Sequence, residues 1–265
     1  MYEQHWGLTS FPYQNLPDPS VFFPSGQHQR ALALLRYAVQ HDKGAALLTG
    51  EIGCGKTTLT RTFILQLPED RYDVGVLTNP ALPPRDFLEE INLQLGITQG
   101  GGGQAELLRV LNGHLLRNAE RDKTTVLIVD EGQGISDPAV FESLRLLLNF
   151  QLNHRFLVAL LLVGQPELAE RIAGIPQLDQ RIAIRCHLGP LDADEAAQYI
   201  VFRLKKAGAS RGIFTEEAVR LLHQAARGIP RSLNTLCDLC LLEGYAAKAT
   251  LVDGALVRRV LQAYR

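Results

Sequence analysis

Residues 50–57 read GEIGCGKT and match the pattern G-x-x-x-x-G-K-[ST] at every fixed position. Glycines in such a loop let the backbone turn so that successive N–H groups face phosphate oxygens, and the helix that follows adds its positive N-terminal end. A short apolar strand is expected at residues 44–49, and a helix is expected to start near Thr57. Because the strand–loop–helix context is present, the stretch predicts a phosphate-binding loop.

The loop residues have separate predicted tasks around a bound nucleotide. Lys56 supplies a positive charge to the β- and γ-phosphates, Thr57 offers its hydroxyl to Mg²⁺, and Thr58 adds a hydrogen bond to the α-phosphate. The other loop residues contribute their backbone, namely Gly50, Glu51, Ile52, Gly53, Cys54 and Gly55. ATP and Mg²⁺ are therefore the expected cofactors.

A second stretch indicates the same chemistry. Residues 124–129 (TTVLIV) are typical of a buried strand, and Asp130 and Glu131 follow them directly. Paired carboxylates at the end of a buried strand are costly unless a cation or a reaction uses them. Asp130 is expected to hold the Mg²⁺ shell and Glu131 to polarise the attacking water. The sequence therefore predicts ATP hydrolysis.

Two polar residues at other predicted strand ends are candidates for supporting roles. Asn79 follows the strand expected at 74–78. It either hydrogen-bonds Glu131 and keeps it inactive, or it is a turn residue before a proline. Gln165 follows the strand expected at 156–163, and it either orients the water beside the γ-phosphate or belongs to a Gly-Gln-Pro turn. The residues alone leave both alternatives open.

Short apolar segments alternate with helical ones over the first two thirds of the chain, which predicts a parallel sheet covered by helices on both faces. Strands are expected at 44–49, 74–78, 124–129, 156–163 and 182–188, and helices at 25–40, 86–95, 105–121 and 137–152. Strand signals then stop, and helices are expected at 192–207, 215–226, 231–248 and 253–264. The predicted fold is an α/β P-loop NTPase domain over residues 1–189, with residues 1–24 as an irregular segment packed onto it, and a small all-α lid domain over residues 190–265. The glycines at 100–103 are expected to form a loop.

The composition is that of an ordinary soluble protein. Of the 265 residues, 46% are hydrophobic and 21% are charged, and the net charge of −1 disfavours a nucleic-acid-binding protein, since those are usually basic. Residues 195–265 carry 11 basic and 6 acidic side chains, a net charge of +5, and the remainder has a net charge of −6. We interpret this difference as a solvated basic face, with a weak site for an anionic partner as the alternative.

The cysteines and the apolar runs indicate the cellular compartment of the protein. Cys54, Cys186, Cys237 and Cys240 form no disulfide framework, and the C-x-x-C pair on an apolar helical stretch is expected to be buried rather than to bind zinc. No signal peptide is visible, and the longest apolar run, 156–163, is shorter than the about 20 residues that span a bilayer. A cytoplasmic protein is expected.

The loop, the Asp-Glu strand end, Gln165 and residues 228–234 (GIPRSLN) together resemble the AAA+ ATPases. The resemblance implies that Arg231 reaches the γ-phosphate from the lid, a contact to which a guanidinium is suited; a surface Arg at a helix N-terminus is the alternative. It also implies a homo-oligomer, a ring or a filament, in which one Arg acts as a finger on the nucleotide of the neighbouring subunit. Arg181 is the first candidate and Arg185 the second, and a surface salt bridge explains either one equally well.

A closer resemblance covers nearly the whole chain. Residues 2–32, with their aromatics and prolines, GQPEL at 164–168 and LDQRI at 178–182 resemble the ExeA/GspA group, ATPases linked to general (type II) secretion. The resemblance implies that the N-terminal segment covers the adenine, with Phe23 and His28 nearby; core and cap packing explains both residues as well. Longer members of the group continue into a membrane span and a peptidoglycan-binding region, and this chain resembles a short form without them.

By this resemblance the chain is an ATPase that drives assembly of a bacterial envelope machine of the type II secretion or pilus kind. A protein partner in that machine is expected and would hold it close to the inner membrane. An ATP-dependent DNA-binding transposition regulator of the MuB/TnsC kind is the alternative, with the basic lid as its DNA surface; the net charge of −1 disfavours it, because DNA affinity comes largely from phosphate neutralisation. A nucleotide-gated switch with little hydrolysis is a third possibility, which Glu131 disfavours.

Overall fold

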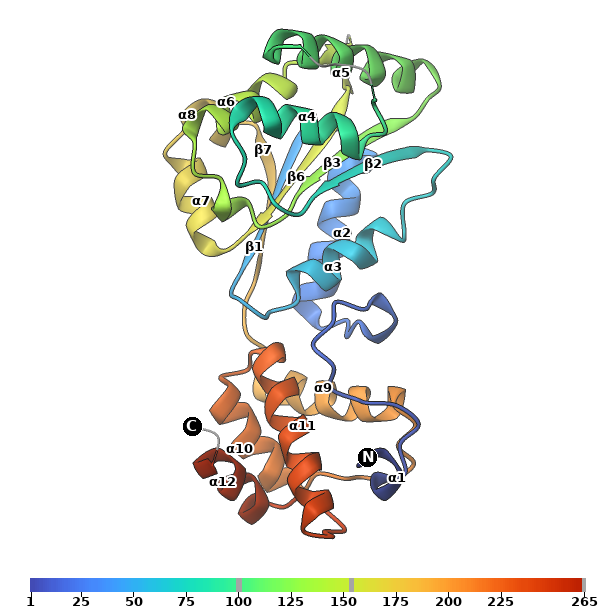
Figure 1. Ribbon diagram of the computed structural model, residues 1–265, viewed down its shortest axis with the longest axis vertical. Helices are drawn as coiled ribbons and strands as arrows, with labels where there is room; N and C mark the ends of the chain where they lie inside the picture. The colour runs from blue at the N-terminus through green and yellow to red at the C-terminus, as the bar shows by residue number, and fades with distance from the viewer. Residues whose placement is uncertain (99–101, 153–154, 264–265) are drawn as a thin grey trace. The chain divides into compact units, whose positions relative to one another are not determined.

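The computed structural model describes residues 1–98, 102–152 and 155–263, and the chain forms two compact units (Figure 1). The sheet unit comprises Gln29–Glu51 and Leu59–Leu188, and the helical unit comprises Met1–His28, Ile52–Thr58 and Gly189–Arg265. The division predicted from the sequence also falls beside residue 189. The two divisions differ because the structure groups the N-terminal segment and the phosphate loop with the C-terminal helices.

A five-stranded parallel sheet forms the centre of the sheet unit, in the order β2-β3-β6-β1-β7 (Figure 1). Its strands are β1 (Ala45–Gly50), β2 (Tyr72–Leu77), β3 (Thr124–Val129), β6 (Val158–Gly164) and β7 (Ile182–Leu188). This confirms the predicted parallel sheet. Since all five strands run in one direction, residues that follow their carboxyl ends gather at one edge of the sheet, where ligands of α/β proteins bind.

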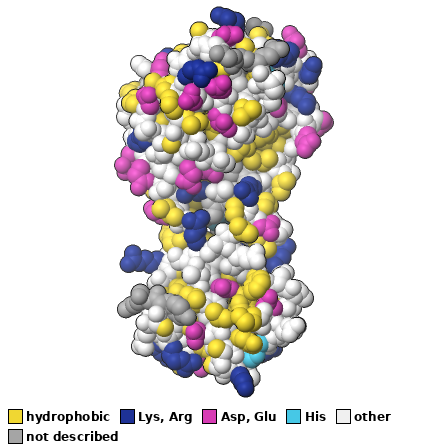
Figure 2. All heavy atoms as spheres, viewed as in Figure 1, with side chains coloured by type: hydrophobic (Ala, Val, Ile, Leu, Met, Phe, Trp, Pro, Cys, Tyr) yellow, Lys and Arg dark blue, Asp and Glu magenta, His cyan; other side chains and the backbone are white. Residues whose placement is uncertain are grey.

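Helices cover both faces of this sheet, as predicted. They are α2 (Gly26–Gln40), α3 (Lys56–Ile64), α4 (Pro84–Gln94), α5 (Gln104–Glu120), α6 (Pro138–Leu147), α7 (Pro166–Ala173) and α8 (Pro176–Asp179). Helices α4 to α8 pack in one core with Leu47, Leu127 and Leu160 of the central strands. On the other face, α2 and Phe63 of α3 pack against Ala46. Figure 2 shows acidic and basic side chains interspersed over the visible face of this unit.

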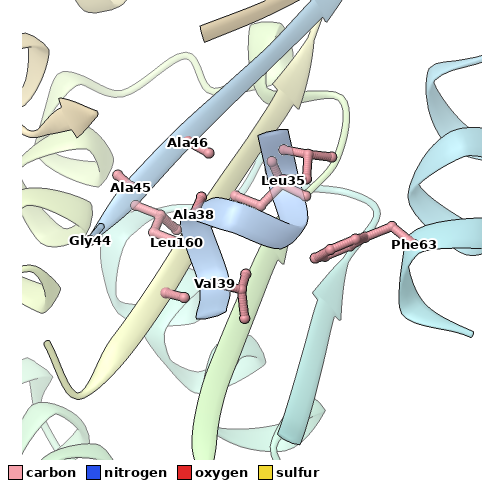
Figure 3. Close-up of a pocket in the computed structure, with 10 residues that line it drawn as sticks. Leu35, Ala38, Val39, Gly44, Ala45, Ala46, Phe63 and Leu160 are labelled. Atoms are coloured by element: carbon pink, nitrogen blue, oxygen red, sulfur yellow. The ribbon is translucent and has the colours of Figure 1, made fainter. Parts of the chain in front are cut away.

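A small apolar cavity lies between α2 and the sheet (Figure 3). Leu35, Val39, Phe63 and Leu160 are among the residues that line it, and its volume is about 10 Å³. That volume is close to the minimum for one water molecule, and the apolar lining offers no hydrogen-bond partners from side chains. The cavity is therefore a gap in packing rather than a ligand site.

The boundaries of the elements differ from the predicted ones in a few places. The helix expected at 137–152 ends at Leu147, and Gln151–Leu152 and Arg155–Phe156 form a short antiparallel pair, β4 and β5. Helices α7 and α8 follow β6 without having been predicted. Of the glycine run at 100–103, the first two residues lie outside the described residues.

Four helices make up most of the helical unit: α9 (Ala193–Lys206), α10 (Glu216–Ala226), α11 (Pro230–Ala246) and α12 (Gly254–Ala263). Each begins and ends within two residues of its predicted range. Asp192 caps α9 by accepting a hydrogen bond from the N–H of Glu195, and Thr215 caps α10 in the same way. Over the described residues, no helix is long and apolar enough to cross a membrane.

The N-terminal segment belongs to the core of the helical unit. It contains α1 (Glu3–Trp6) and a 3₁₀ turn, η1 (Pro19–Val21), so it is more regular than predicted. Trp6 is 1% exposed and donates from Nε1 to the carbonyl oxygen of Leu241 over 2.9 Å. Trp6, together with Tyr2 and Tyr13, is thus a packing residue of this core.

A buried arginine ties the same segment to α9. Arg203 is 6% exposed and donates from Nε to the carbonyl oxygen of Pro12 over 2.7 Å and from Nη2 to that of Gln14 over 3.0 Å. Its Nη1 donates to the hydroxyl of Tyr199 over 2.9 Å. Burial of a guanidinium is costly unless it is hydrogen-bonded, and these bonds use three of its five N–H donors.

Candidate functional site

The phosphate loop has the backbone that its sequence predicts. Gly53 and Gly55 have φ angles of +85° and +94°, a region that glycine adopts without steric cost. Helix α3 begins at Lys56, so the loop leads directly into a helix N-terminus, whose positive end favours an anion. Lys56 is only 7% exposed. The loop therefore has the local geometry of an anion-binding turn.

His28 supports the loop from inside the helical unit. Its Nε2 lies 3.0 Å from the carbonyl oxygen of Cys54, and its Nδ1 lies 2.7 Å from the hydroxyl oxygen of Ser25. A carbonyl only accepts, so Nε2 carries the proton and Nδ1 of the neutral ring accepts from the serine. Burial lowers the pKa of His28 and outweighs the hydrogen bond to Cys54, which favours the charged ring. Both ring nitrogens are therefore used in holding the loop.

The start of α11 also contacts the loop. The N–H of Arg231 donates to the carbonyl oxygen of Gly53 over 3.3 Å. A Cβ atom on Gly53 would lie 2.7 Å from Cβ of Arg231 and 3.0 Å from Cγ2 of Ile229, so only glycine fits there. The side chain of Arg231 is exposed. Within the helical unit, the residue predicted to sense the γ-phosphate is thus anchored by its backbone to the phosphate loop.

Phe23 packs against α9. Its ring centroid lies 5.6 Å from that of Tyr199 and 5.5 Å from that of Phe202. These ring contacts agree with core packing, which is one of the two explanations that the sequence leaves open for Phe23. Together with the contacts of His28, it gives both residues a structural role within the helical unit.

In the sheet unit, the predicted acidic pair follows β3. Asp130 is 5% exposed, and its N–H donates to the carbonyl oxygen of Leu77 at the end of β2 over 2.8 Å. One carboxylate oxygen of Asp130 accepts the N–H of Glu131 over 2.9 Å. Glu131 is exposed and has a φ angle of +54°, an uncommon conformation for a residue with a side chain. A buried and an exposed carboxylate thus stand side by side at this strand end.

Gln133, which belongs to no predicted motif, connects this strand end to the next. Its side chain donates to the carboxylate of Glu131 and accepts the N–H of Gln165 over 3.0 Å. Gln165 follows β6 and is the N-cap of α7. The glutamine carries no motif signal, since its bond to Gln165 joins residues 32 positions apart.

Asn79 shows the turn geometry that was one of its two alternatives. Its side-chain oxygen accepts the N–H of Ala81 over 3.4 Å, the local pattern of an Asx turn. Over the described residues, the hydrogen-bond partner of the Glu131 carboxylate is Gln133.

The two arginines considered as fingers both have partners within the sheet unit. Arg181 is half-buried and donates from Nη1 to the carbonyl oxygen of Leu148, just past the end of α6, over 2.9 Å. Arg185 is more exposed and pairs with the carboxylate of Asp179 over 2.7 Å. The salt-bridge alternative therefore describes Arg185, whereas Arg181 caps a helix.

The cysteines are buried thiols. Burial raises the pKa of Cys186 to about 11 and that of Cys240 to about 12, and it raises the pKa of Cys237 well above its usual value. The burial of Cys237 and Cys240 fits their predicted packing role. No group of three or more His, Cys, Asp or Glu in the described part of the chain could hold a metal ion.

Comparison with known sequences adds the family. Residues 39–172 match the family model described as AAA domain. Over 250 residues, 93% of this chain, the sequence is 39% identical to general secretion pathway protein A of Aeromonas hydrophila. The match covers 45% of that protein, so the chain spans less than half the length of this relative.

Solved structures show the same fold at low sequence identity. The structure of Drosophila ORC bound to DNA contains a chain with a TM-score of 0.72 and 18% identity, over 98% of this chain and 64% of that one. The ORC2 protein of Aeropyrum pernix with ADPNP and ADP has a TM-score of 0.67 and 16% identity, over 90% and 67% of the two chains. Cdc6p from Pyrobaculum aerophilum has a TM-score of 0.64 and 20% identity, over 93% and 71%. These similarities confirm the predicted α/β fold followed by a helical region.

Proposed function

The chain belongs to the AAA domain family, and on that basis we propose that it binds ATP with Mg²⁺ and hydrolyses it. The observation that carries the proposal is the phosphate loop: two glycines with positive φ lead into a helix that begins at Lys56. Backbone N–H groups at such a turn recognise phosphate without any base-specific contact. The acidic pair after β3 adds the groups that hydrolysis requires.

The residues fit Mg²⁺ as the accompanying metal. The carboxylate of Asp130 and the hydroxyl of Thr57 are hard oxygen ligands, and Mg²⁺ is commonly held by one or two protein groups together with phosphate and water. When bound, Mg²⁺ neutralises charge on the phosphate oxygens.

Six further residues have proposed roles in the same reaction. Lys56 balances charge on the β- and γ-phosphates, Thr58 binds the α-phosphate, and Glu131 polarises the attacking water. Gln165 orients that water, and Arg231 senses the γ-phosphate. His28 keeps the loop in its binding conformation, which replaces a direct contact with adenine as its role.

We further propose that hydrolysis depends on a homo-oligomer with an arginine acting in trans. Arg185 is a better candidate for this role than Arg181. Its side chain is 43% exposed, and a surface ion pair such as the one with Asp179 contributes about 1 kcal/mol or less, so it separates at little cost. Arg181, by contrast, would have to leave the carbonyl oxygen of Leu148. Turnover per subunit that rises with protein concentration and is lost in Arg185→Ala supports this assignment.

Nucleotide binding and turnover, measured separately, test the proposal. Glu131→Gln keeps the shape of the side chain but removes its charge; we expect ATP to bind as in the wild type while turnover falls on the order of 100-fold or more. Lys56→Ala is expected to lose ATP binding itself. Glu120→Gln, on the exposed end of α5, is the control and should leave both unchanged. A wild-type chain that binds no ATP contradicts the proposal, and undiminished turnover in Glu131→Gln removes that residue from its role.

For the biological role, we propose assembly of a bacterial envelope machine of the type II secretion or pilus kind. The support is the 39% identity with general secretion pathway protein A. On the face of the helical unit that Figure 2 shows, Lys and Arg side chains stand as separate groups rather than as one basic surface. Loss of secretion or piliation on expression of Glu131→Gln in the source organism supports this role. Salt-sensitive, ATP-dependent binding of duplex DNA at micromolar protein favours the transposition-regulator role instead.

A further inference from the structure

The side-chain amide of Gln133 has a defined orientation. A backbone N–H only donates, so the amide oxygen must face Gln165, which it meets at 3.0 Å. The amide nitrogen then faces the carboxylate of Glu131, which only accepts when ionised. Both ends of the side chain are therefore satisfied in one arrangement and in no flipped one.

The backbone that carries this glutamine is held against α7. Gln133 lies in the 3₁₀ turn η2 (Gly132–Gly134), and its carbonyl oxygen accepts from Nη1 of Arg171 over 2.9 Å. A Cβ atom on Gly132 would lie 2.8 Å from Cδ2 of Leu168, and one on Gly164 would lie 2.7 Å from the same atom. The two glycines thus permit close packing of the turn and the strand end on α7. The position of Gln133 is fixed by these contacts independently of its own side chain.

Among the described residues, the Glu131 carboxylate has its hydrogen bond from Gln133. Its side chain is exposed, and its own carbonyl oxygen is bonded to the N–H of Gly134 over 2.8 Å, which fixes the backbone only. An exposed glutamate ordinarily samples several rotamers, and a group that acts on water must spend its time in one of them. The bond from Gln133 supplies that restriction.

We propose that Gln133 is a positioning residue for hydrolysis. It holds the Glu131 carboxylate in its working orientation. Because the same side chain also bonds the N–H of Gln165, a displacement of that strand end would move the Glu131 carboxylate, and the reverse. This inference rests on the proposed ATPase function, and it adds a residue that acts on Glu131 rather than on the nucleotide.

The test uses two variants of the full chain: one loses both the donor and the acceptor of the Gln133 side chain, and the other loses the donor alone. Gln133→Met has a similar length but neither donor nor acceptor. A misplacement of about 1 Å at a reacting group can cost on the order of 100-fold in rate, so we expect kcat to fall about tenfold or more while KM and the Kd for ATP stay unchanged. Gln133→Glu keeps an acceptor for the N–H of Gln165 but sets a carboxylate against Glu131. We expect its kcat to fall at least as far, because it lacks the donor.

Gln94→Met is the matched control. Gln94 donates to the carboxylate of Glu90 over 2.8 Å on the exposed side of α4, so this change removes the same kind of bond away from the strand ends. It should keep the wild-type kcat, and thermal melts should show all variants folded. A kcat at or above the wild-type value in Gln133→Met overturns the inference, as does a fall matched by weaker ATP binding. If the wild-type chain binds ATP but does not hydrolyse it, the proposed ATPase function itself is overturned, and this result is distinguishable from any effect of Gln133→Met.

Discussion

His28 and Cys54 are joined by a hydrogen bond in which the imidazole Nε2 donates to the backbone carbonyl oxygen over 3.0 Å. The two residues lie 26 positions apart in the sequence. The bond therefore makes the shape of the phosphate loop depend on a side chain outside the loop motif. The same ring nitrogen would lie 3.1 Å from a Cβ atom added to Gly55, so a side chain at that position would crowd the ring.

Removing the ring should weaken nucleotide binding. His28→Ala deletes a hydrogen bond with a net value of about 1 kcal/mol and leaves the buried hydroxyl of Ser25 without its ring partner, so we expect the Kd for ATP to rise about five- to tenfold. A titration with a fluorescent ATP analogue measures it. His41→Ala, an exposed histidine after α2, should leave the Kd unchanged. An unaltered Kd in His28→Ala would show that the loop keeps its shape alone.

The stability of the helical unit should depend on pH through His28. Burial lowers its pKa in the folded chain below the usual value of about 6.5, so as the pH falls below 6.5 the unfolded chain takes up a proton that the folded chain does not. The contribution of neutral His28 to the free energy of unfolding is complete above pH 6.5, and it is lost as the pH falls through the pKa of His28 in the folded chain. We expect the free energy of unfolding to decrease from pH 7.5 to 5.5, and to decrease less in His28→Gln, which keeps a donor but does not titrate.

Urea denaturation followed by tryptophan fluorescence measures this difference. Trp6 is the single tryptophan of the chain and is buried in the helical unit, the unit that contains His28. Equal pH dependence in the wild type and in His28→Gln would contradict the prediction.

Gly53 should not tolerate a side chain. Gly53→Ala places a residue at a φ angle of +85°, which costs about 1–2 kcal/mol, and brings its Cβ to 2.7 Å from Arg231. We expect ATP affinity to fall at least about tenfold. Gly96→Ala, after α4, is the control for a strained alanine outside the loop, because Gly96 has a φ angle of +69° but a Cβ atom added to it would meet no atom within 4 Å. It should cost stability alone, and an equal loss of ATP affinity in both variants would refute the steric explanation.

Arg203 should contribute strongly to the stability of the helical unit. Arg203→Met removes three hydrogen bonds from a side chain that is 6% exposed and leaves two backbone carbonyls without it, so we expect a loss of about 3 kcal/mol in the free energy of unfolding. Arg258→Met, at an exposed ion pair with Glu217, should lose about 1 kcal/mol or less. Similar losses in the two variants would mean that the N-terminal segment is not held by Arg203.

Much of the fold follows from local patterns. The phosphate loop is recognisable because phosphate binding requires fixed residue types at fixed spacing, and the strands β3 and β7 have their predicted boundaries because short apolar runs have few other uses. The helix expected at 137–152 was too long, since the pattern remains apolar past Leu147 and does not show where the chain turns into β4.

The candidate site was only partly predictable, and the reason is distance along the chain. Local sequence determined the loop, the acidic pair and the strand ends, because each is defined by neighbouring residues. The tertiary structure alone decided that Gln133 accepts from the N–H of Gln165, that Arg203 holds the N-terminal segment, and that His28 supports the loop. These contacts join residues 26 to 191 positions apart. The bonds of Gln133 to Glu131 and of Ala81 to Asn79 span two positions, and there the structure decided between partners that the sequence left open. A sequence pattern records which side chains can form hydrogen bonds, whereas packing determines which partners come within reach.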